Sequence, residues 1–391
     1  MTAPYVTTSD TTPRWSVRQR VASAARWLTT PLMPDDYLGL LNPLWSVEEL
    51  RGRVEAVHPE TADVATLVIR PGRNWVPHRP GQWARIGIDI EGVRHWRAYS
   101  LSSMPERPDG CVTITVKAVP DGLVSRHLVQ RTALGTILGL TGPEGEFVLP
   151  EPPPPRLLFL TAGSGITPVM AMLRSLLTGG AADGEEAWGA GVSRGGAVSL
   201  LNEKQREMPD VVLVHSAPMP EDVIFGEELR GLAARFPNLR LYERHTRAGG
   251  RLKPTDLPAL CPDWADRAVW ACGPTEMLHE VTAHWAGLGD RLHVEHFRPA
   301  VSAADSEGGR VRFTQSGREV DADGGTPLLT VGEDAGVLMP SGCRMGICFG
   351  CVGRLSSGQV CDLRTGQVHG EEGDLVQTCV SAAAGPVEIE F

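Results

Sequence analysis

Four cysteines near the C-terminus have the spacing of metal-cluster ligands. Cys343, Cys348 and Cys351 follow the pattern C-x4-C-x2-C, and Cys379 comes 28 residues after Cys351. This spacing is typical of the thiolates that hold a [2Fe–2S] cluster, in which three ligands come from one tight loop. A four-cysteine zinc site is the alternative, but such sites usually have two C-x2-C pairs. We therefore expect a one-electron carrier in this part of the chain.

The surroundings of these cysteines support the cluster. An unhindered backbone can turn its N–H groups towards the sulfides, and four glycines offer this freedom: Gly342, Gly346, Gly350 and Gly353. The segments MPSGCRMGICFGC and LVQTCVSAA resemble the ferredoxin-like domain of bacterial oxygenase and desaturase reductases. Plant ferredoxins usually have a small residue where this chain has Phe349. Cys361 lies outside the pattern, and we expect a packed or surface thiol there.

A second pair of motifs has the chemistry of a flavin site. Arg97-Ala98-Tyr99-Ser100 is followed, 22 residues after Tyr99, by Asp121-Gly122-Leu123-Val124-Ser125. A flavin needs an aromatic ring to stack on, a cation for its diphosphate, and N–H groups with a hydroxyl at a helix start. Tyr99, Arg97 and the turn from Gly122 to Ser125 offer these groups. Either motif alone is common on a solvated strand, so the prediction depends on their order.

Two further motifs indicate a nucleotide site. Thr161-Ala162-Gly163-Ser164-Gly165-Ile166-Thr167-Pro168 follows an apolar run and opens a helix, so bare backbone at the glycines can approach a pyrophosphate. A lone G-x-G is as often a plain strand–helix turn. Ala271-Cys272-Gly273-Pro274, after a second apolar run, makes the nucleotide reading the stronger one.

Together these motifs resemble the ferredoxin–NADP reductase superfamily, whose members carry R-x-Y-S followed by G-x-x-S. The resemblance covers the chain from about residue 50 to its end, and Pro80-Gly81-Gln82-Trp83 matches the P-G-Q-aromatic step of the family. It implies that Trp83 approaches the flavin and that Cys272 lies beside the nicotinamide, where hydride leaves for the flavin.

A last short motif closes this part of the chain. Glu295-His296-Phe297 matches the E-x-F of flavohaemoglobin-type reductases, in which the aromatic ring covers the flavin, although an ordinary edge strand would have the same pattern. The resemblance thus implies a reaction centre of four residues: Tyr99, Ser100, Cys272 and Glu295.

The cofactors follow from these sites. We expect FAD, because the G-x-x-S segment starts a helix that can hold a diphosphate, and FMN is the alternative. The electron donor is NADPH or NADH: Ser216 could bond a 2′-phosphate, but Ala217 and Pro218 supply no adjacent cation. The flavin would take two electrons as hydride and pass them singly to the cluster.

Composition and periodicity divide the chain into four segments. Residues 46–150 contain short alternating runs between Gly/Pro turns and predict an antiparallel β-barrel for the flavin. After the linker EPPPP, residues 156–298 alternate apolar strands with helices and predict a parallel α/β sheet for NAD(P). Residues 305–391 are expected to form an α+β domain of the β-grasp type. Residues 1–45 form an N-terminal extension.

The extension contains an amphipathic pattern over residues 14–28. Val17, Val21, Ala24 and Leu28 share one helical face, which predicts a helix docked on the next domain, or else one that contacts a membrane surface or a partner. No apolar run is long enough to span a bilayer and no secretory signal is evident. We therefore expect a cytoplasmic protein, with the inner membrane surface as the alternative location.

Charge restricts the partners. The net charge is −10, and residues 304–391 hold 13 acidic and 6 basic side chains, or −7. An acidic electron carrier argues against nucleic acid and predicts a protein acceptor with a basic docking face. PDDYLGLLNPLWS and CRMGICFGC resemble actinobacterial reductases that feed acyl-CoA desaturases; a Rieske oxygenase and a cytochrome P450 are the alternative acceptors. A non-enzymatic redox sensor is disfavoured because it would not need complete flavin and nicotinamide motifs.

Overall fold

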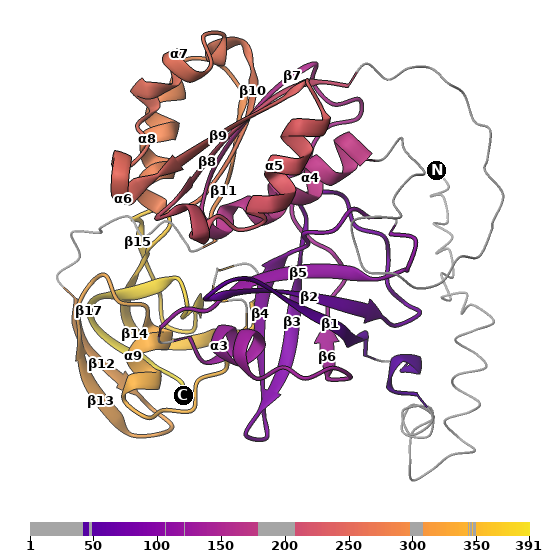
Figure 1. The fold of residues 1–391 in the computed structure, drawn as a ribbon. Helices are drawn as coiled ribbons and strands as arrows, with labels where there is room; N and C mark the ends of the chain where they lie inside the picture. Colours follow the sequence, from indigo (N-terminus) through magenta and orange to yellow (C-terminus); the bar gives the residue numbers. More distant parts are fainter. Residues whose placement is uncertain are drawn as a thin grey trace, which may run out of the picture.

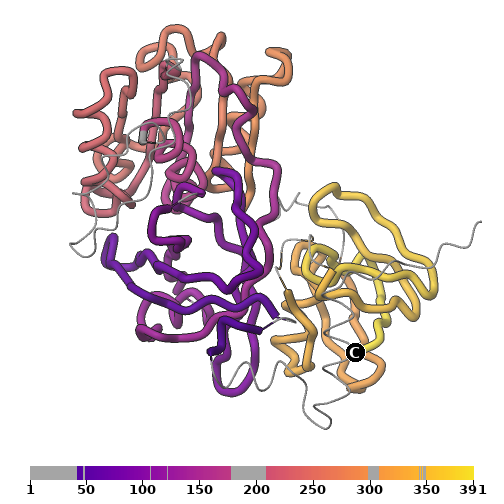
Figure 2. Tube along the Cα trace, turned by 90° about the vertical axis from the view of Figure 1, so that its right-hand side faces the viewer, coloured from indigo at the N-terminus to yellow at the C-terminus, as the bar shows by residue number. Residues whose placement is uncertain are grey.

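The computed structural model describes residues 42–46, 49–105, 107–120, 122–178, 208–297, 308–342, 344, 346 and 349–391. These residues form three bodies, each built on its own sheet (Figure 1). The two views agree that the C-terminal body lies beside the barrel, while the α/β body packs on another side of the barrel (Figures 1 and 2). The predicted helix over residues 14–28 lies outside the described residues. Within the described part of the chain, no helix combines the length and the apolar character required to cross a bilayer.

The first body is an antiparallel sheet in the order β4-β3-β6-β1-β2-β5. Its strands are β1 (Arg51–Thr61), β2 (Val64–Pro71), β3 (Trp83–Ile90), β4 (Val93–Ser100), β5 (Val112–Lys117) and β6 (Ile137–Leu140). Its two end strands meet, because Leu101 pairs with Ile114 and the Ser102 N–H donates to the Thr113 carbonyl at 2.8 Å. The sheet thereby closes into a barrel at this point, as predicted.

Two helical elements and a buried core complete the barrel. The 3₁₀ turn η1 (Pro43–Trp45) precedes β1, and α3 (Leu123–Gln130) packs beside β5 (Figure 1). Alternate strand residues point inward and are almost completely buried, among them Leu67, Ile69, Ile86 and Ile114. Burial of each such side chain contributes about 1.5–3 kcal/mol to the stability of the barrel. The barrel therefore holds β4, the strand with the predicted flavin residues, in a fixed position.

The second body is a parallel sheet in the order β11-β10-β7-β8-β9, as the alternation of strands and helices predicts. The strands are β7 (Arg156–Ala162), β8 (Asp210–Ala217), β9 (Leu239–His245), β10 (Ala268–Cys272) and β11 (Leu292–Glu295). The helices are α4 (Ile166–Thr178), α5 (Gly226–Arg235), α6 (Thr246–Gly249), α7 (Leu257–Leu260) and α8 (Thr275–Trp285), with 3₁₀ turns η2 (Gly163–Gly165), η3 (Pro220–Asp222), η4 (Pro254–Asp256) and η5 (Trp264–Asp266). Helices α4 and α5 cover one face and α7 and α8 the other, which explains why the central strands are continuously apolar (Figure 1).

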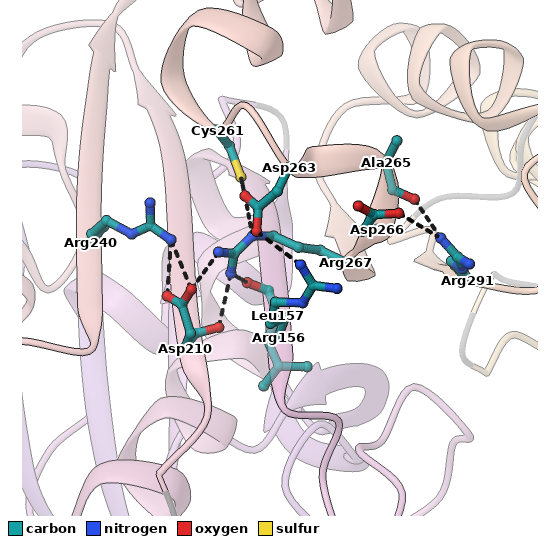
Figure 3. Close-up of polar contacts among 10 residues, drawn as sticks. All are labelled: Arg156, Leu157, Asp210, Arg240, Cys261, Asp263, Ala265, Asp266, Arg267 and Arg291. Carbon is teal, nitrogen blue, oxygen red and sulfur yellow. Dashed lines mark hydrogen bonds and ion pairs between the residues drawn. The ribbon is translucent and has the colours of Figure 1, made fainter.

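A buried arginine fastens the amino ends of these strands (Figure 3). The Arg267 guanidinium is 1% exposed and donates to Asp210 Oδ2 at 2.5 Å, to Asp263 Oδ1 at 2.9 Å and to the Leu157 carbonyl at 3.1 Å. These bonds tie the starts of β7 and β8 to the segment before β10. A buried charge is tolerated when it is paired and hydrogen-bonded in this way. The cluster therefore stabilises the end of the sheet opposite to the glycine loop.

The third body is a mixed sheet in the order β13-β12-β17-β14-β15, with β16 paired to β14. Its elements are β12 (Gly309–Phe313), β13 (Arg318–Ala322), α9 (Leu328–Asp334), β14 (Val352–Asp362), β15 (Val368–His369), β16 (Leu375–Gln377) and β17 (Ser381–Ile389). The β12–β13 hairpin is closed at the pair Phe313–Arg318, whereas β12 and β17 run parallel. A mixed sheet packed against α9 is the predicted α+β arrangement.

Candidate functional site

The glycine loop and the Cys272 turn meet at the carboxyl ends of β7 and β10. A Cβ on Gly165 would lie 2.0 Å from the Cys272 carbonyl oxygen, so only glycine fits there. Gly163 has a φ of +52°, in the left-handed region that glycine adopts without strain. The Thr167 hydroxyl donates to the Ser164 carbonyl at 2.9 Å and fixes the turn. The two motifs that the sequence analysis paired are therefore in contact.

A cavity of about 540 Å³ opens beside this contact. Of the residues predicted to bind the nicotinamide cofactor or to cover the flavin, the cavity is lined by Gly163, Ser164, Gly165, Gly273, Pro274 and Phe297. Its size, the bare backbone and the start of α4 fit a nucleotide with its pyrophosphate. The other predicted residues, Thr161, Thr167, Pro168 and Cys272, do not line the cavity. Thr161 instead bonds the buried His215 ring at 2.8 Å, which supports the loop from below.

Several lining residues escaped the sequence analysis because they come from distant segments. Lys117 reaches the cavity from the end of β5, and its ammonium lies 3.1 Å from Asp63 Oδ2. Thr246 and Arg251 line it together with Ser216, and Arg251 pairs with Glu276. The fold thus brings to Ser216 a cation that its sequence neighbours lack. No local pattern marks these residues, since their meeting depends on the packing of the barrel against the sheet.

Glu295 ends β11 directly beside Cys272, its partner in the parallel register. Burial raises the pKa of the Glu295 carboxyl to about 8, and its Oε2 atom has no hydrogen-bond partner among the residues described. Burial, with the neighbouring Glu295, also raises the pKa of the Cys272 thiol. At neutral pH both groups hold their protons, so the pair offers hydrogen-bond donors rather than charges.

The predicted flavin strand is β4, which pairs with β3 in the register Trp83–Ser100, Ala84–Tyr99, Arg85–Ala98 and Ile86–Arg97. Tyr99 packs against the barrel core, and burial raises the pKa of its phenol. The Ser100 hydroxyl is buried without a hydrogen-bond partner in the described residues. The Arg97 guanidinium donates to the Trp96 carbonyl at 2.8 Å. An aromatic ring, a cation and an unpaired hydroxyl on one strand fit a flavin.

The turn from Gly122 to Ser125 begins α3, with Gly122 as the N-cap and Leu123, Val124 and Ser125 in the first turn. A Cβ on Gly122 would lie 2.4 Å from Ser125 Oγ, which accepts from the Val119 N–H at 3.1 Å. The serine therefore shapes the turn, and the first N–H groups of the helix supply the anion-binding capacity. Asp121 lies outside the described residues.

Trp83, predicted to approach the flavin, is 7% exposed. Its indole packs on Gly145, where a Cβ would lie 2.8 Å from Trp83 Nε1. The backbone N–H of Trp83 also donates to the Glu144 carbonyl at 2.9 Å. Trp83 therefore packs within the barrel, and its approach to the flavin stays a prediction.

Two of the four cluster cysteines, Cys351 and Cys379, are described, and both are buried. A hydrogen bond between their side chains lowers the pKa of the Cys351 thiol, which favours the thiolate that binds iron. The Thr378 hydroxyl donates a hydrogen bond to the Cys351 carbonyl at 2.7 Å. Cys343 and Cys348 lie outside the described residues. Neighbouring buried sulfurs on a fixed backbone fit a thiolate-bound cluster.

Glycine is not the sole residue type with a left-handed backbone among the described residues of the cysteine loop. Of the four glycines, Gly346 has a left-handed φ of +72°, and among the loop residues that the structure describes Arg344 (+58°) and Phe349 (+53°) are left-handed as well. Gly353 has a different reason: a Cβ there would lie 2.3 Å from the Phe391 ring. Cys361 is a buried thiol on β14, as expected.

Arg344, a described residue of the cysteine loop, lies near β4, the strand that carries the predicted flavin residues. His95 lies on β4 and is close enough to the third body for its pKa to be lowered by burial and then by the charges of Arg97 and Arg344. Arg344, from the cysteine loop, pairs with Glu333 of α9. The two views show the same proximity of barrel and C-terminal body (Figures 1 and 2). The C-terminal body therefore lies near β4, the strand that carries the predicted flavin residues.

Comparisons with known proteins agree with this geometry. Residues 56–149 match the oxidoreductase FAD-binding domain, and residues 311–384 match the 2Fe-2S iron-sulfur cluster binding domain. The chain is similar to the NADPH oxidoreductase of Mycobacterium tuberculosis, with 48% identity covering 99% of this chain and 96% of the relative. It is 30% identical to the glycine betaine monooxygenase reductase subunit of Pseudomonas aeruginosa over 90% of this chain and 99% of the relative. Phthalate dioxygenase reductase shares the fold, with a TM-score of 0.56 and 21% identity over 88% of this chain and 98% of that structure.

These similarities confirm three expectations: FAD as the flavin, a [2Fe–2S] cluster at the C-terminus, and NAD(P)H as the donor. The chain therefore belongs to the oxidoreductases of the ferredoxin–NADP reductase superfamily that join an FAD-binding barrel and a nicotinamide domain to a C-terminal [2Fe–2S] domain.

Proposed function

We propose that this protein takes hydride from NADPH and delivers single electrons, through FAD and its own [2Fe–2S] cluster, to an acyl-CoA desaturase. The observation that carries the electron route is the position of the barrel. Lys117 of the barrel lines the nucleotide cavity. The charge of Arg344 in the cysteine loop contributes to lowering the pKa of His95, which also belongs to the barrel. The barrel therefore borders the nucleotide cavity and lies near the cysteine loop, which supports an electron route through the flavin.

Several of the predicted residues have a part in this route. The flavin, when bound, supplies the conversion of a two-electron hydride into single electrons. Tyr99 would stack on its ring and Arg97 would pair with its diphosphate, while the start of α3 holds the remaining phosphate oxygens. Gly163 and Gly165 would admit the nicotinamide pyrophosphate, and Phe297 would cover the flavin until the nicotinamide enters. Glu295 would donate a hydrogen bond beside Cys272.

Two observations favour NADPH over NADH. Ser216, Thr246 and Arg251 line one cavity, and together they offer hydroxyls and a cation for a 2′-phosphate. The relative with 48% identity is named an NADPH oxidoreductase.

The acceptor follows from the resemblance of PDDYLGLLNPLWS and CRMGICFGC to desaturase reductases. The acidic third body supports a partner with a basic docking face. The name of the 30% identical relative, a monooxygenase reductase subunit, supports an oxygenase as the second candidate acceptor.

The test is reconstitution. The purified protein, NADPH and a membrane fraction containing an acyl-CoA desaturase are supplied with a saturated acyl-CoA, and the unsaturated product is quantified. A parallel reaction contains a Rieske oxygenase and its substrate. The variant Cys348→Ser serves as control, because it should lose the cluster yet keep flavin reduction by NADPH. Product from the oxygenase alone would overturn the desaturase assignment.

A further inference from the structure

Arg174 crosses from the α/β body to the barrel. It lies on α4, the helix that begins directly after the glycine loop, and is buried at the contact of the two bodies. Its Nη1 donates to the Ser102 carbonyl at 2.6 Å. Ser102 follows β4, the strand that carries Tyr99 and Ser100. One side chain therefore connects the nucleotide helix to the flavin strand.

The guanidinium is held in place from its own side. Its Nε and Nη2 donate to the two carboxylate oxygens of Glu228 on α5, at 2.8 and 2.6 Å. The Phe225 ring lies 5.0 Å from the Arg174 Cζ atom and packs over the guanidinium. A bidentate ion pair of this kind fixes the plane of the guanidinium, and therefore the direction of the bond to Ser102.

The receiving side is equally fixed. The buried Ser102 hydroxyl bonds Thr115 at 3.0 Å, Thr115 bonds Thr66 at 2.8 Å, and Thr66 donates to Glu60 at 2.6 Å. Because each hydroxyl has one proton, the donation to Glu60 orders the chain, with Thr115 donating to Thr66 and Ser102 to Thr115. The Ser102 carbonyl is thus presented to Arg174 by a rigid barrel wall.

Apolar packing surrounds this bond. Val64 and Phe147 of the barrel belong to the same core as Met172, which lies two residues before Arg174 on α4. Apolar contacts hold surfaces together without specifying a direction, so they permit small sliding movements. A short charge-assisted hydrogen bond specifies both distance and angle.

We propose that Arg174 is a positioning residue that sets the distance between the nucleotide loop and the flavin strand, and thereby the geometry of hydride transfer. The inference rests on the proposed use of NADPH and FAD. A displacement of about 1 Å far from the reacting atoms can cost about a hundredfold in rate. Loss of the Arg174–Ser102 bond is therefore expected to slow the chemical step and to leave nucleotide affinity nearly unchanged.

The experiment compares Arg174→Gln and Arg174→Lys with Arg267→Gln in the full-length protein loaded with FAD. Arg267 is the matched control: it is buried, paired with carboxylates and in the same body, but at the opposite end of the sheet (Figure 3). Stopped-flow reduction at saturating NADPH gives the limiting rate, and NADP⁺ titration gives the dissociation constant. Hydrogen exchange of residues 101–113 reports the barrel wall without requiring turnover.

For Arg174→Gln we expect a limiting rate about ten- to a hundredfold lower, a dissociation constant within about twofold of wild type, and faster exchange over residues 101–113. Arg174→Lys should recover part of the rate, because an ammonium still donates to the carbonyl. Glu228→Gln removes the carboxylate charge and leaves one acceptor oxygen for the two N–H groups of Arg174, so it loosens the guanidinium and replaces Arg174→Gln if that variant does not fold. Equal rates in wild type and the Arg174 variants, or an equal loss in Arg267→Gln, would overturn the inference. A wild-type protein whose flavin is not reduced by NADPH would contradict the proposed function instead.

Discussion

The carbonyl oxygen of Cys272 occupies the space that a side chain on Gly165 would need, with 2.0 Å between that oxygen and an ideal Cβ. Gly165→Ala must therefore push the nucleotide loop away from β10. We expect a loss of about 1–3 kcal/mol in the stability of the α/β body, together with weaker NADP⁺ binding. Thermal unfolding and NADP⁺ titration measure the two effects.

Gly231→Ala is the control for this variant. Gly231 lies in α5, and a Cβ there meets no atom within 4 Å, so alanine should preserve binding and slightly stabilise the helix. If both variants bind NADP⁺ as the wild type does, the close approach of loop and turn has no role in binding.

The buried carboxyl of Glu295 predicts a pH dependence of stability. Its pKa is about 8 in the folded protein against an ordinary value of 4.5, so between these values the unfolded chain releases a proton that the folded protein keeps. Stability contributed by this group is complete below about pH 4.5 and is lost as pH rises to about 8. Glu295→Gln lacks this titration.

The measurement is the thermal midpoint of the flavin-free protein from about pH 5 to about pH 8, for wild type and variant. We expect the wild type to lose stability relative to Glu295→Gln as pH rises. If the thermal midpoints of wild type and Glu295→Gln changed equally with pH, the Glu295 carboxyl would be exposed to water and its pKa would not be raised.

Flavin binding is expected to depend on Arg97. A charge-assisted contact contributes about 1.5–3 kcal/mol, so Arg97→Ala should weaken FAD binding about ten- to a hundredfold. Arg94→Ala is the control on the same strand, because Arg94 is exposed and paired with Asp89 at 2.8 Å. FAD retained after dialysis is measured by absorbance. If both Arg97→Ala and Tyr99→Ala retained all of their FAD, the assignment of β4 to the flavin site would be wrong.

Most of the fold was predictable because its signals are local. The continuous apolar runs of β7 and β8 mark strands buried on both faces, and the alternation of Ile86, Ile88 and Ile90 with other residues marks the inward face of barrel strand β3. The motifs around Gly165 and Cys272 each follow a strand of the parallel sheet, so both were expected at its carboxyl edge. Their contact also requires that β10 pairs with β7, although β8 and β9 lie between them in the chain, and no local pattern gives that strand order.

The remaining site residues could not be predicted from local patterns. Lys117 and Arg251 are 134 positions apart and enter one cavity only because two bodies pack together. The left-handed conformations of Arg344 and Phe349 are imposed by the cysteine loop against the preference of both residue types, so a search for glycine missed them.

The cation at Arg251 gives a test of donor preference. Arg251→Ala should raise the KM for NADPH about tenfold and change the KM for NADH much less, because only NADPH carries the 2′-phosphate. Arg235→Ala, at the end of α5 with its guanidinium over the Phe236 ring, is the control. Steady-state rates with both nucleotides provide the comparison. An equal change in the two KM values would mean that Arg251 contacts the pyrophosphate, or no part of the nucleotide, rather than the 2′-phosphate.

The −7 charge of residues 304–391 predicts that electron delivery depends on salt. Opposite potentials accelerate the encounter of the acidic third body with a basic acceptor, and this attraction is screened beyond about 8 Å at physiological ionic strength. Acceptor reduction should therefore slow steeply as salt rises. Flavin reduction takes place within the complex once NADPH is bound, so its limiting rate should change much less.

Both rates are measured by stopped flow over the same salt series. Equal salt dependence, or faster delivery at high salt, would mean that the acceptor docks through apolar contacts and that the acidic surface serves solubility alone.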